Sequence, residues 1–153
     1  MKGDTHIVGG FVASLAASQV IPHDPFIIMG ASVIGSLLPD ICHTGSTVGR
    51  LFPYISKPIN KLFGHRTITH SLLFLVILSF LLDDTAFKAG ILAGVIGHYL
   101  LDMATKNGIQ LFYPLKRRIR FPLTISTGGK MESVVKIGLS VVVFMILFHS
   151  ITK

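Results

Sequence analysis

Imidazole and carboxylate side chains recur where apolar segments of this sequence begin or end. Neutral imidazoles and carboxylates bind Zn²⁺, Mn²⁺ and Fe²⁺ well, and two ions become possible when several such ligands converge. We therefore expect a site for one or two divalent cations, with zinc as the first candidate and manganese or iron as alternatives. The candidate ligands are His6, Asp40, His43, His65, His70, His98 and Asp102.

His98 and Asp102 form the clearest single pattern among these residues. They stand four positions apart in an apolar segment, which places both side chains on one face of a helix, where they can bind one ion. A buried histidine hydrogen-bonded to an aspartate would give the same spacing. The pair therefore indicates a metal site only in combination with the other runs.

A histidine-rich run, residues 64–71, reads GHRTITHS and precedes another apolar segment. It supplies two imidazoles and one guanidinium at the start of a predicted helix. The simpler interpretation is that Thr69 caps this helix and leaves His70 in solvent. In the same way, residues 38–43 could be only a helix end, and His6 could belong to a simple helix cap.

Hydrolysis is the chemistry that such a site would support. A bound metal ion lowers the pKa of its water toward 7 and polarises a phosphoryl or acyl oxygen. Asp40, Asp102 or Glu132 could hold the attacking water as general base, and Arg66 could stabilise charge in the transition state. Residues 127–130 could offer backbone N–H groups to a phosphate, or could be only a flexible loop.

Five apolar segments must position these residues, and polar stretches separate them. Two prolines follow the first segment, and an acidic pair follows the third. Residues 39–69 read as a long loop with one short amphipathic helix, and residues 106–133 form a second polar stretch. The apolar segments are residues 7–21, 26–38, 71–82, 86–105 and 134–151.

The composition places these segments in a membrane. Half of the 153 residues are hydrophobic, only 14% are charged, and the mean hydropathy is +0.68, whereas about a quarter of the residues in a soluble domain are charged. We predict a single all-α domain, residues 1–153, that forms an integral membrane bundle of about five helices. The first three segments are shorter than the ~20 residues that cross a bilayer, and the first two could pair as a shallow hairpin through small residues such as Gly9 and Gly10.

The basic residues predict the orientation of this bundle. If all five segments cross, twelve of the 14 Lys and Arg residues lie on or beside one face, and only Lys88 and Lys153 lie near the other. Because basic residues mark the cytoplasmic side, we expect a multi-pass inner-membrane protein whose two long polar stretches face the cytoplasm. The bilayer then accounts for the net charge of +7, and no nucleic-acid partner is expected.

If the five segments cross the membrane in alternating directions, all seven candidate ligands lie at the cytoplasmic end, with Glu132 beside them. Ionisable groups are costly at membrane depth, so several at one level indicate a shared ligand. A metal transporter would need polar residues across the apolar layer, and residues 71–82 and 134–151 have few. A noncatalytic membrane protein with a structural or sensing metal would instead fill every coordination position with protein ligands.

A basic run, residues 116–120, lies in the second polar stretch and reads KRRIR. It suits an anionic head group, or it is no more than the positive charge that the orientation requires. A site at the bilayer surface favours membrane lipids as partners and an amphiphilic, phosphate-bearing substrate such as a phospholipid or a polyprenyl phosphate.

Several motifs follow one another along the chain: Thr5-His6, Leu38-Pro39-Asp40 with His43, the GHRTITHS run, and Gly97-His98-Tyr99-Leu100-Leu101-Asp102 with Thr105, Gly108 and Tyr113-Pro114. Together they resemble the YdjM-like family of LexA-regulated, membrane-bound, predicted metal-dependent hydrolases. The resemblance implies an integral membrane protein with a metal-dependent hydrolase site. The ligand pattern is also similar in style to the zinc-dependent phospholipases C and nucleases, which cleave phosphoesters.

One position departs from the family pattern. The family reads Pro-Asp-x-Asp-His where this chain has Pro39-Asp40-Ile41-Cys42-His43. A Cys42 thiolate could bind zinc in place of the carboxylate, could act behind the ligands, or could mark the alteration of one of two metal sites.

Overall fold

The computed structural model describes residues 1–152, except for the side chains of residues 150 and 151, and this part of the chain is helical with two isolated β-bridges. The all-α prediction is confirmed. Lys153, which the charge pattern places near the far face, lies outside the described residues. The α-helices are α1 (Gly3–Ser18), α2 (Pro25–Leu37), α3 (Thr47–Leu51), α4 (Pro53–Phe63), α5 (Leu72–Leu81), α6 (Thr85–Met103) and α7 (Lys130–Ile151), and the 3₁₀ helices are η1 (Leu38–Cys42) and η2 (Ile68–His70).

Each of the five predicted apolar segments is a helix, and polar side chains cap several of them. The Asp24 carboxylate accepts the Phe26 N–H at the start of α2, and Asp84 accepts the Phe87 N–H at the start of α6. The stretch 39–69 differs from the prediction because it holds two short α-helices, α3 and α4, rather than one. Ser46 caps α3, and Pro53 begins α4, where proline's missing N–H costs nothing.

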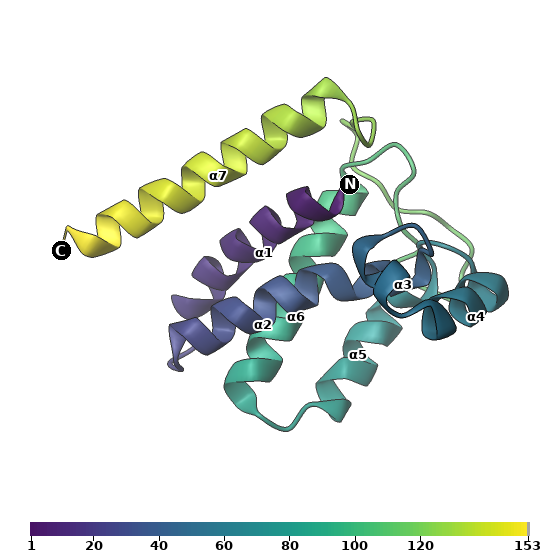
Figure 1. Cartoon of the computed structure of the whole chain (residues 1–153), viewed down its shortest axis with the longest axis horizontal. Coiled ribbons are helices and arrows are strands. Elements are labelled where there is room, and N and C mark those ends of the chain that lie inside the picture. Colours follow the sequence, from purple (N-terminus) through teal and green to yellow (C-terminus); the bar gives the residue numbers. More distant parts are fainter. Residues whose placement is uncertain (153) are drawn as a thin grey trace.

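Helices α1, α2 and α6 pack side by side as the centre of the bundle (Figure 1). Small residues allow this close approach: a Cβ on Gly35 would collide with the Ile91 carbonyl, and one on Gly94 with the Ser32 carbonyl. The Ser32 hydroxyl also donates to the Gly10 carbonyl at 2.9 Å. The predicted pairing of the first two helices through small residues is therefore observed.

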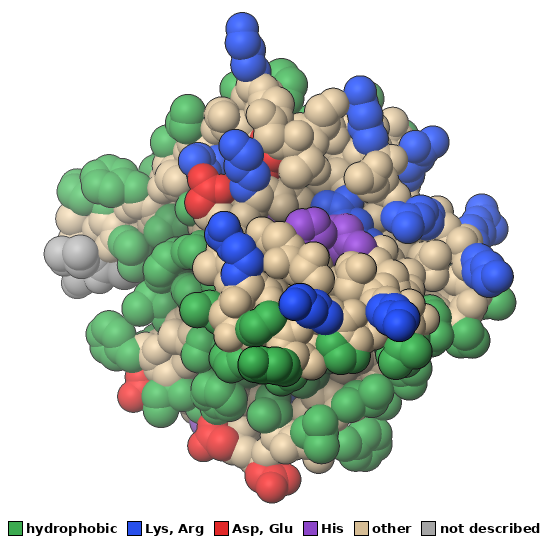
Figure 2. Space-filling view, turned by 45° about the vertical axis from the view of Figure 1, so that its right-hand side comes forward, with side chains coloured by type: hydrophobic (Ala, Val, Ile, Leu, Met, Phe, Trp, Pro, Cys, Tyr) green, Lys and Arg blue, Asp and Glu red, His purple; other side chains and the backbone are tan. Residues whose placement is uncertain are grey.

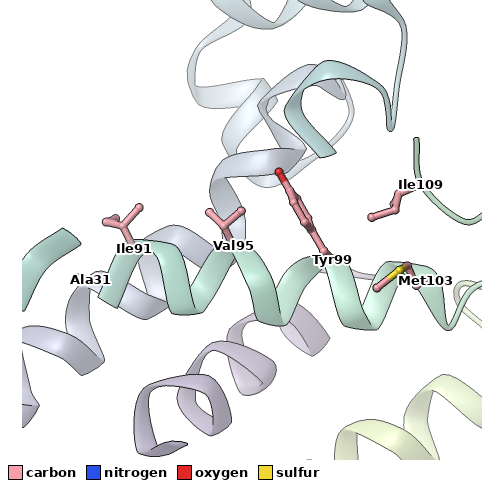
Figure 3. Close-up of a cluster of buried hydrophobic side chains, with 6 residues drawn as sticks. All are labelled: Ala31, Ile91, Val95, Tyr99, Met103 and Ile109. Carbon is pink, nitrogen blue, oxygen red and sulfur yellow. The ribbon is translucent and has the colours of Figure 1, made fainter. Parts of the chain in front are cut away.

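One buried apolar cluster lies along α6 on the side of α5 and the loop that follows α6 (Figure 3). Leu75 and Leu78 of α5 pack against it. Most of this cluster comes from one helix because side chains four residues apart share a face of α6. Its members are Ala31, Ile91, Val95, Tyr99, Met103 and Ile109.

Three helical stretches are long and apolar enough to cross a membrane: Pro25–Cys42, Thr85–Met103 and Lys130–His149. Helices α1 and α5 have 16 and 10 residues, so their crossing stays a prediction. Figure 2 shows a belt of hydrophobic side chains between an end rich in Lys and Arg and an end with acidic side chains. This distribution of charge around an apolar belt fits a protein embedded in a bilayer.

Candidate metal centre

Four side chains from three elements converge at the basic end of the bundle. Asp40 lies in η1, which continues α2, His70 ends η2, and His98 and Asp102 lie in the last turns of α6. One ligand atom from each of the four lies within 4.8 Å of the other three. The tertiary structure thus brings four of the seven predicted ligands together, and we call them the four-residue cluster.

The distances within the four-residue cluster match those of a tetrahedral metal site. His70 Nε2 and His98 Nε2 are 3.1 Å apart, and each lies 3.5 Å from Asp102 Oδ2 and 3.8 Å from Asp40 Oδ1. Four ligands placed about 2.1 Å from one tetrahedral ion are about 3.4 Å from one another. A single ion at the centre of the four atoms therefore needs only small movements of the side chains.

Hydrogen bonds from backbone and hydroxyl groups orient the two imidazoles. His98 Nδ1 donates to the Ser36 carbonyl at 2.6 Å, and a carbonyl can only accept, so His98 Nε2 presents a lone pair to the cluster. His70 Nδ1 lies 3.1 Å from the Thr69 hydroxyl, which allows the same tautomer. If His70 carries its proton on Nε2, the 3.1 Å contact with His98 Nε2 is a hydrogen bond; if it carries the proton on Nδ1, two lone pairs face each other and a cation would bind between them.

Asp102 is held by one of its oxygens and free at the other. Oδ1 accepts the Arg66 Nη2–H at 2.8 Å and the Met1 amino group, and it lies 3.4 Å from His6 Nε2. Oδ2 faces both cluster imidazoles, is buried, and has no hydrogen-bond partner. A buried carboxylate oxygen without a partner is costly, and a bound cation would remove that cost.

Tyr99 attaches η2 to α6 and so places His70. Its hydroxyl lies within hydrogen-bond distance of the Thr69 and Ser71 carbonyls, at 2.9 and 3.0 Å. The His70 ring is fully buried and stacks on Tyr99 with ring centroids 6.0 Å apart. The simpler interpretation of residues 64–71, in which Thr69 caps the next helix and His70 lies in solvent, is wrong. Ser71 rather than Thr69 caps α5, and His70 is buried.

Arg66 lies at a tight turn before η2. Its backbone φ is 62°, in the left-handed region that a non-glycine residue rarely adopts. The turn aims its buried guanidinium at Asp102 and at the Thr105 hydroxyl, which lies 2.6 Å from Nη1. The structure therefore gives Arg66 a positioning contact with the four-residue cluster, and its role in a transition state stays a prediction.

His6 lies beside the four-residue cluster but outside it. Its ring stacks on His98 with centroids 3.7 Å apart and an interplanar angle of 11°. It is fully buried, and neither ring nitrogen has a hydrogen-bond partner. His6 does not act as a cap, because α1 begins at Gly3 with no side-chain cap, and its free nitrogens make it the next candidate ligand.

Cys42, His43 and His65 form a second group beside the four-residue cluster, in which Cys42 is fully buried and His43 is exposed. His65 Nδ1 lies 3.3 Å from Cys42 Sγ, and its ring meets that of His43 edge-on at 4.6 Å. His43 is exposed and its Nδ1 accepts the Gly45 N–H. The structure brings these three together around His65 but not into the four-residue cluster, and their role as ligands stays a prediction.

Glu132 is committed to backbone and hydroxyl donors away from the four-residue cluster. Oε1 accepts the Lys2 N–H and, at 2.9 Å, the Thr5 hydroxyl, and Oε2 accepts the Gly128 N–H. These bonds tie the start of α7 to the start of α1. The Gly128 N–H suggested for phosphate binding already has this partner, and a general-base role for Glu132 has no support in these contacts.

Burial keeps the imidazoles of His65 and His70 neutral. Desolvation lowers the pKa of His70 to about 4, despite the raising effect of Asp102. Desolvation, followed by the nearby His70, lowers the pKa of His65 to about 3. Both imidazoles are therefore neutral near pH 7, which is the form that binds metal.

A cavity of about 500 Å³ reaches the four-residue cluster from solvent. Asp40, which is 14% exposed, borders it together with His43, His65 and Arg66. Figure 2 shows histidine side chains in a hollow surrounded by Lys and Arg side chains. The cluster is thus reached from solvent through a cavity whose lining includes the cations Lys2, Arg50 and Arg66.

Sequence patterns missed the groups that orient the ligands. Ser36 acts through its backbone carbonyl, which carries no residue-type signal. Thr105 follows Asp102 by three residues, and its hydroxyl donates to the Asp102 carbonyl at 2.7 Å, a spacing that could have indicated a local contact. The Tyr99 hydroxyl was visible within the family motif, but only the fold shows that it holds η2.

Comparison with known proteins supports the resemblance seen in the motifs. The family described as "YdjM inner membrane protein" matches residues 1–153. The "Uncharacterized protein YvsG" of Bacillus subtilis (strain 168) is 42% identical over 97% of this chain and 98% of its own length. The "Inner membrane protein YdjM" of Escherichia coli (strain K12) is 35% identical over 74% of this chain, and the match spans 63% of that protein. No solved structure matches.

Proposed function

The chain belongs to the YdjM inner membrane protein family, and we propose that it is a membrane-bound, metal-dependent hydrolase of an amphiphilic ester or phosphoester. The observation that carries this proposal is the four-residue cluster, in which two oriented imidazoles face a buried carboxylate oxygen without a partner. Asp40, His70, His98 and Asp102 would hold the ion. When bound, a divalent ion supplies a water of lowered pKa and polarises the substrate oxygen.

The residues around the cluster have separate tasks in this proposal. Arg66 holds Asp102 so that Oδ2 stays turned toward His70 and His98. Asp40 stands at the edge of the cavity, so its second carboxylate oxygen can take a proton from the attacking water. The cationic wall of the cavity favours a substrate with a negative group.

A structural metal in a noncatalytic membrane protein is the second candidate. Four protein ligands can fill a tetrahedral site completely, as in structural zinc centres. Transport is less well supported, because α5 and α7 carry few polar side chains that could line a path for an ion across the apolar layer.

Metal analysis tests the cluster directly. We expect detergent-purified protein to carry about one divalent ion per chain, His98→Ala to lose it, and His149→Ala, on the exposed surface of α7, to keep it. Screens with phosphomonoesters, phosphodiesters and short-chain phospholipids then test turnover. Metal retained in His98→Ala would contradict the ligand assignment, and bound metal without turnover of any substrate would favour the structural alternative.

Site-directed labelling tests the proposed cytoplasmic orientation of the metal end. Asp83 lies in the turn between α5 and α6, and Ser126 lies in the loop before α7; both are exposed. A membrane-impermeant maleimide should label Asp83→Cys in intact cells and Ser126→Cys only after the membrane is opened, while buried Cys42 stays unlabelled. The reverse pattern would place the metal end outside.

A further inference from the structure

A second cavity, which we call the basic hollow, adjoins the metal centre. It measures about 750 Å³ and is lined by His65, Arg66, Lys106, Asn107, Arg118 and Arg120. His65, Arg66 and Asn107 also line the cavity that reaches the four-residue cluster. The two cavities therefore lie next to each other and share these three residues as a wall.

Backbone contacts hold two of the cations at the hollow. Arg118 Nη1 donates to the Asn107 carbonyl at 3.3 Å, and Arg120 Nη1 donates to the Lys106 carbonyl at 3.1 Å. Ile109 and Ile119 pair as an antiparallel β-bridge, which keeps the two loop segments side by side. These contacts within the loop after α6 thus fix the shape of the hollow.

Arg66 is paired with Asp102, but the other three cations, Lys106, Arg118 and Arg120, form no salt bridge within the described part of the chain. None of the seven Asp and Glu residues, all of which lie in the described part of the chain, lines the hollow. Arg66 at the shared wall is 4% exposed, and its Nε has no hydrogen-bond partner. Lys106, Arg118 and Arg120 therefore give the hollow an excess of positive charge that an anion would balance.

We propose that the basic hollow binds a second anionic group, of the phosphate or diphosphate class, on the substrate that is cleaved at the metal centre. The claim that this ligand is a substrate rests on the proposed hydrolase function. Binding of the anionic group itself does not require a metal. Guanidinium groups suit phosphate oxygens because they form paired, charge-assisted hydrogen bonds. The ligand would then place one acidic group on Arg118 and Arg120 and its scissile ester past Arg66, beside Asp40.

Equilibrium binding to the full-length, chelator-treated protein in neutral detergent tests the proposal. The probes are inorganic diphosphate and short-chain phosphatidic acid, with phosphatidylcholine of the same chain length as the neutral-head-group control. The variant is Arg118→Gln with Arg120→Gln. Its matched control is Lys116→Gln with Arg117→Gln, which removes the same charge from the same loop at positions that do not line the hollow.

We expect the Arg118 and Arg120 variant to weaken binding of at least one anionic probe about tenfold or more, and the control variant to change it about twofold or less. Binding of diphosphate would identify a soluble phosphate group as sufficient, and binding of phosphatidic acid alone would identify a lipid head group. Equal losses in both variants, or no binding of either probe, would overturn the proposal. The protein is metal-free in this binding assay. Anion binding can therefore be interpreted even if the hydrolase screen detects no turnover.

Discussion

Helices α6 and α7 are both long and apolar enough to cross a membrane, yet they differ in what surrounds them. Half of the α6 span is buried inside the protein, against 6% of the α7 span. Helix α6 has glycines where α1 and α2 approach and carries His98 and Asp102. Helix α7 presents apolar side chains such as Phe144 and Met145 outward. An apolar helix can therefore be a lipid-facing span or the scaffold of a polar site, and its small residues distinguish the two.

The largest expected difference between the two helices concerns their glycines. Gly94→Leu in α6 would drive a side chain into the Ser32 backbone, whereas Gly138 in α7 has nothing within 4 Å of a Cβ. We expect Gly94→Leu to lower the free energy of unfolding by about 3 kcal/mol or more, and Gly138→Leu to leave it nearly unchanged. Thermal unfolding in detergent measures both. Equal stability of the two variants would show that α6 is not packed as described.

The carboxylates of the two helices should differ in metal binding. Asp102→Asn in α6 removes a ligand of the four-residue cluster, so metal affinity should fall about a hundredfold or more. Glu132→Gln in α7 should keep the metal, because Glu132 binds the Lys2, Thr5 and Gly128 groups instead. Competition with a chromogenic chelator measures both affinities. Loss of metal in Glu132→Gln would bring Glu132 back as a metal-site residue.

The smallest effect on the free energy of unfolding is expected from Ile→Val substitutions, which remove one methylene. Ile91 of α6 is 2% exposed within the apolar cluster, and Ile137 of α7 is 62% exposed. Ile91→Val should cost about 1 kcal/mol of unfolding free energy, while Ile137→Val should cost almost nothing, because its side chain makes few protein contacts. A similar cost at both positions would mean that α7 is covered by protein, for instance by a second copy of the chain.

The apolar segments were predictable because each one is bounded by prolines, acidic caps or polar loops, and the five helices follow those boundaries closely. The His98 and Asp102 pair was predictable because spacing within one helix determines which side chains share a face. The stretch 39–69 was less predictable: its two short helices depend on Ser46 and Pro53 as local starts. These signals are too short to stand out inside a polar segment.

The division of the seven candidate ligands could not be read from residue types. His43 and His70 are both histidines beside apolar segments, but His43 is exposed on a loop while His70 is buried against Tyr99. Glu132 stands near the same end as Asp40, yet its oxygens are occupied by donors from the start of α1 and the loop before α7. Each outcome depends on contacts between segments that are distant in the sequence.

The sequence by itself determined an all-helical, apolar chain in which most histidines and basic residues stand in the polar stretches or near the ends of the apolar segments, because composition and helical periodicity are local properties. Only the tertiary structure decided which ligands meet. Asp40, His70 and His98 converge because α2 and α6 pack through glycines and Tyr99 holds η2 against α6. A metal site needs atoms within a few ångströms of one another, and only the packing of these elements sets that distance.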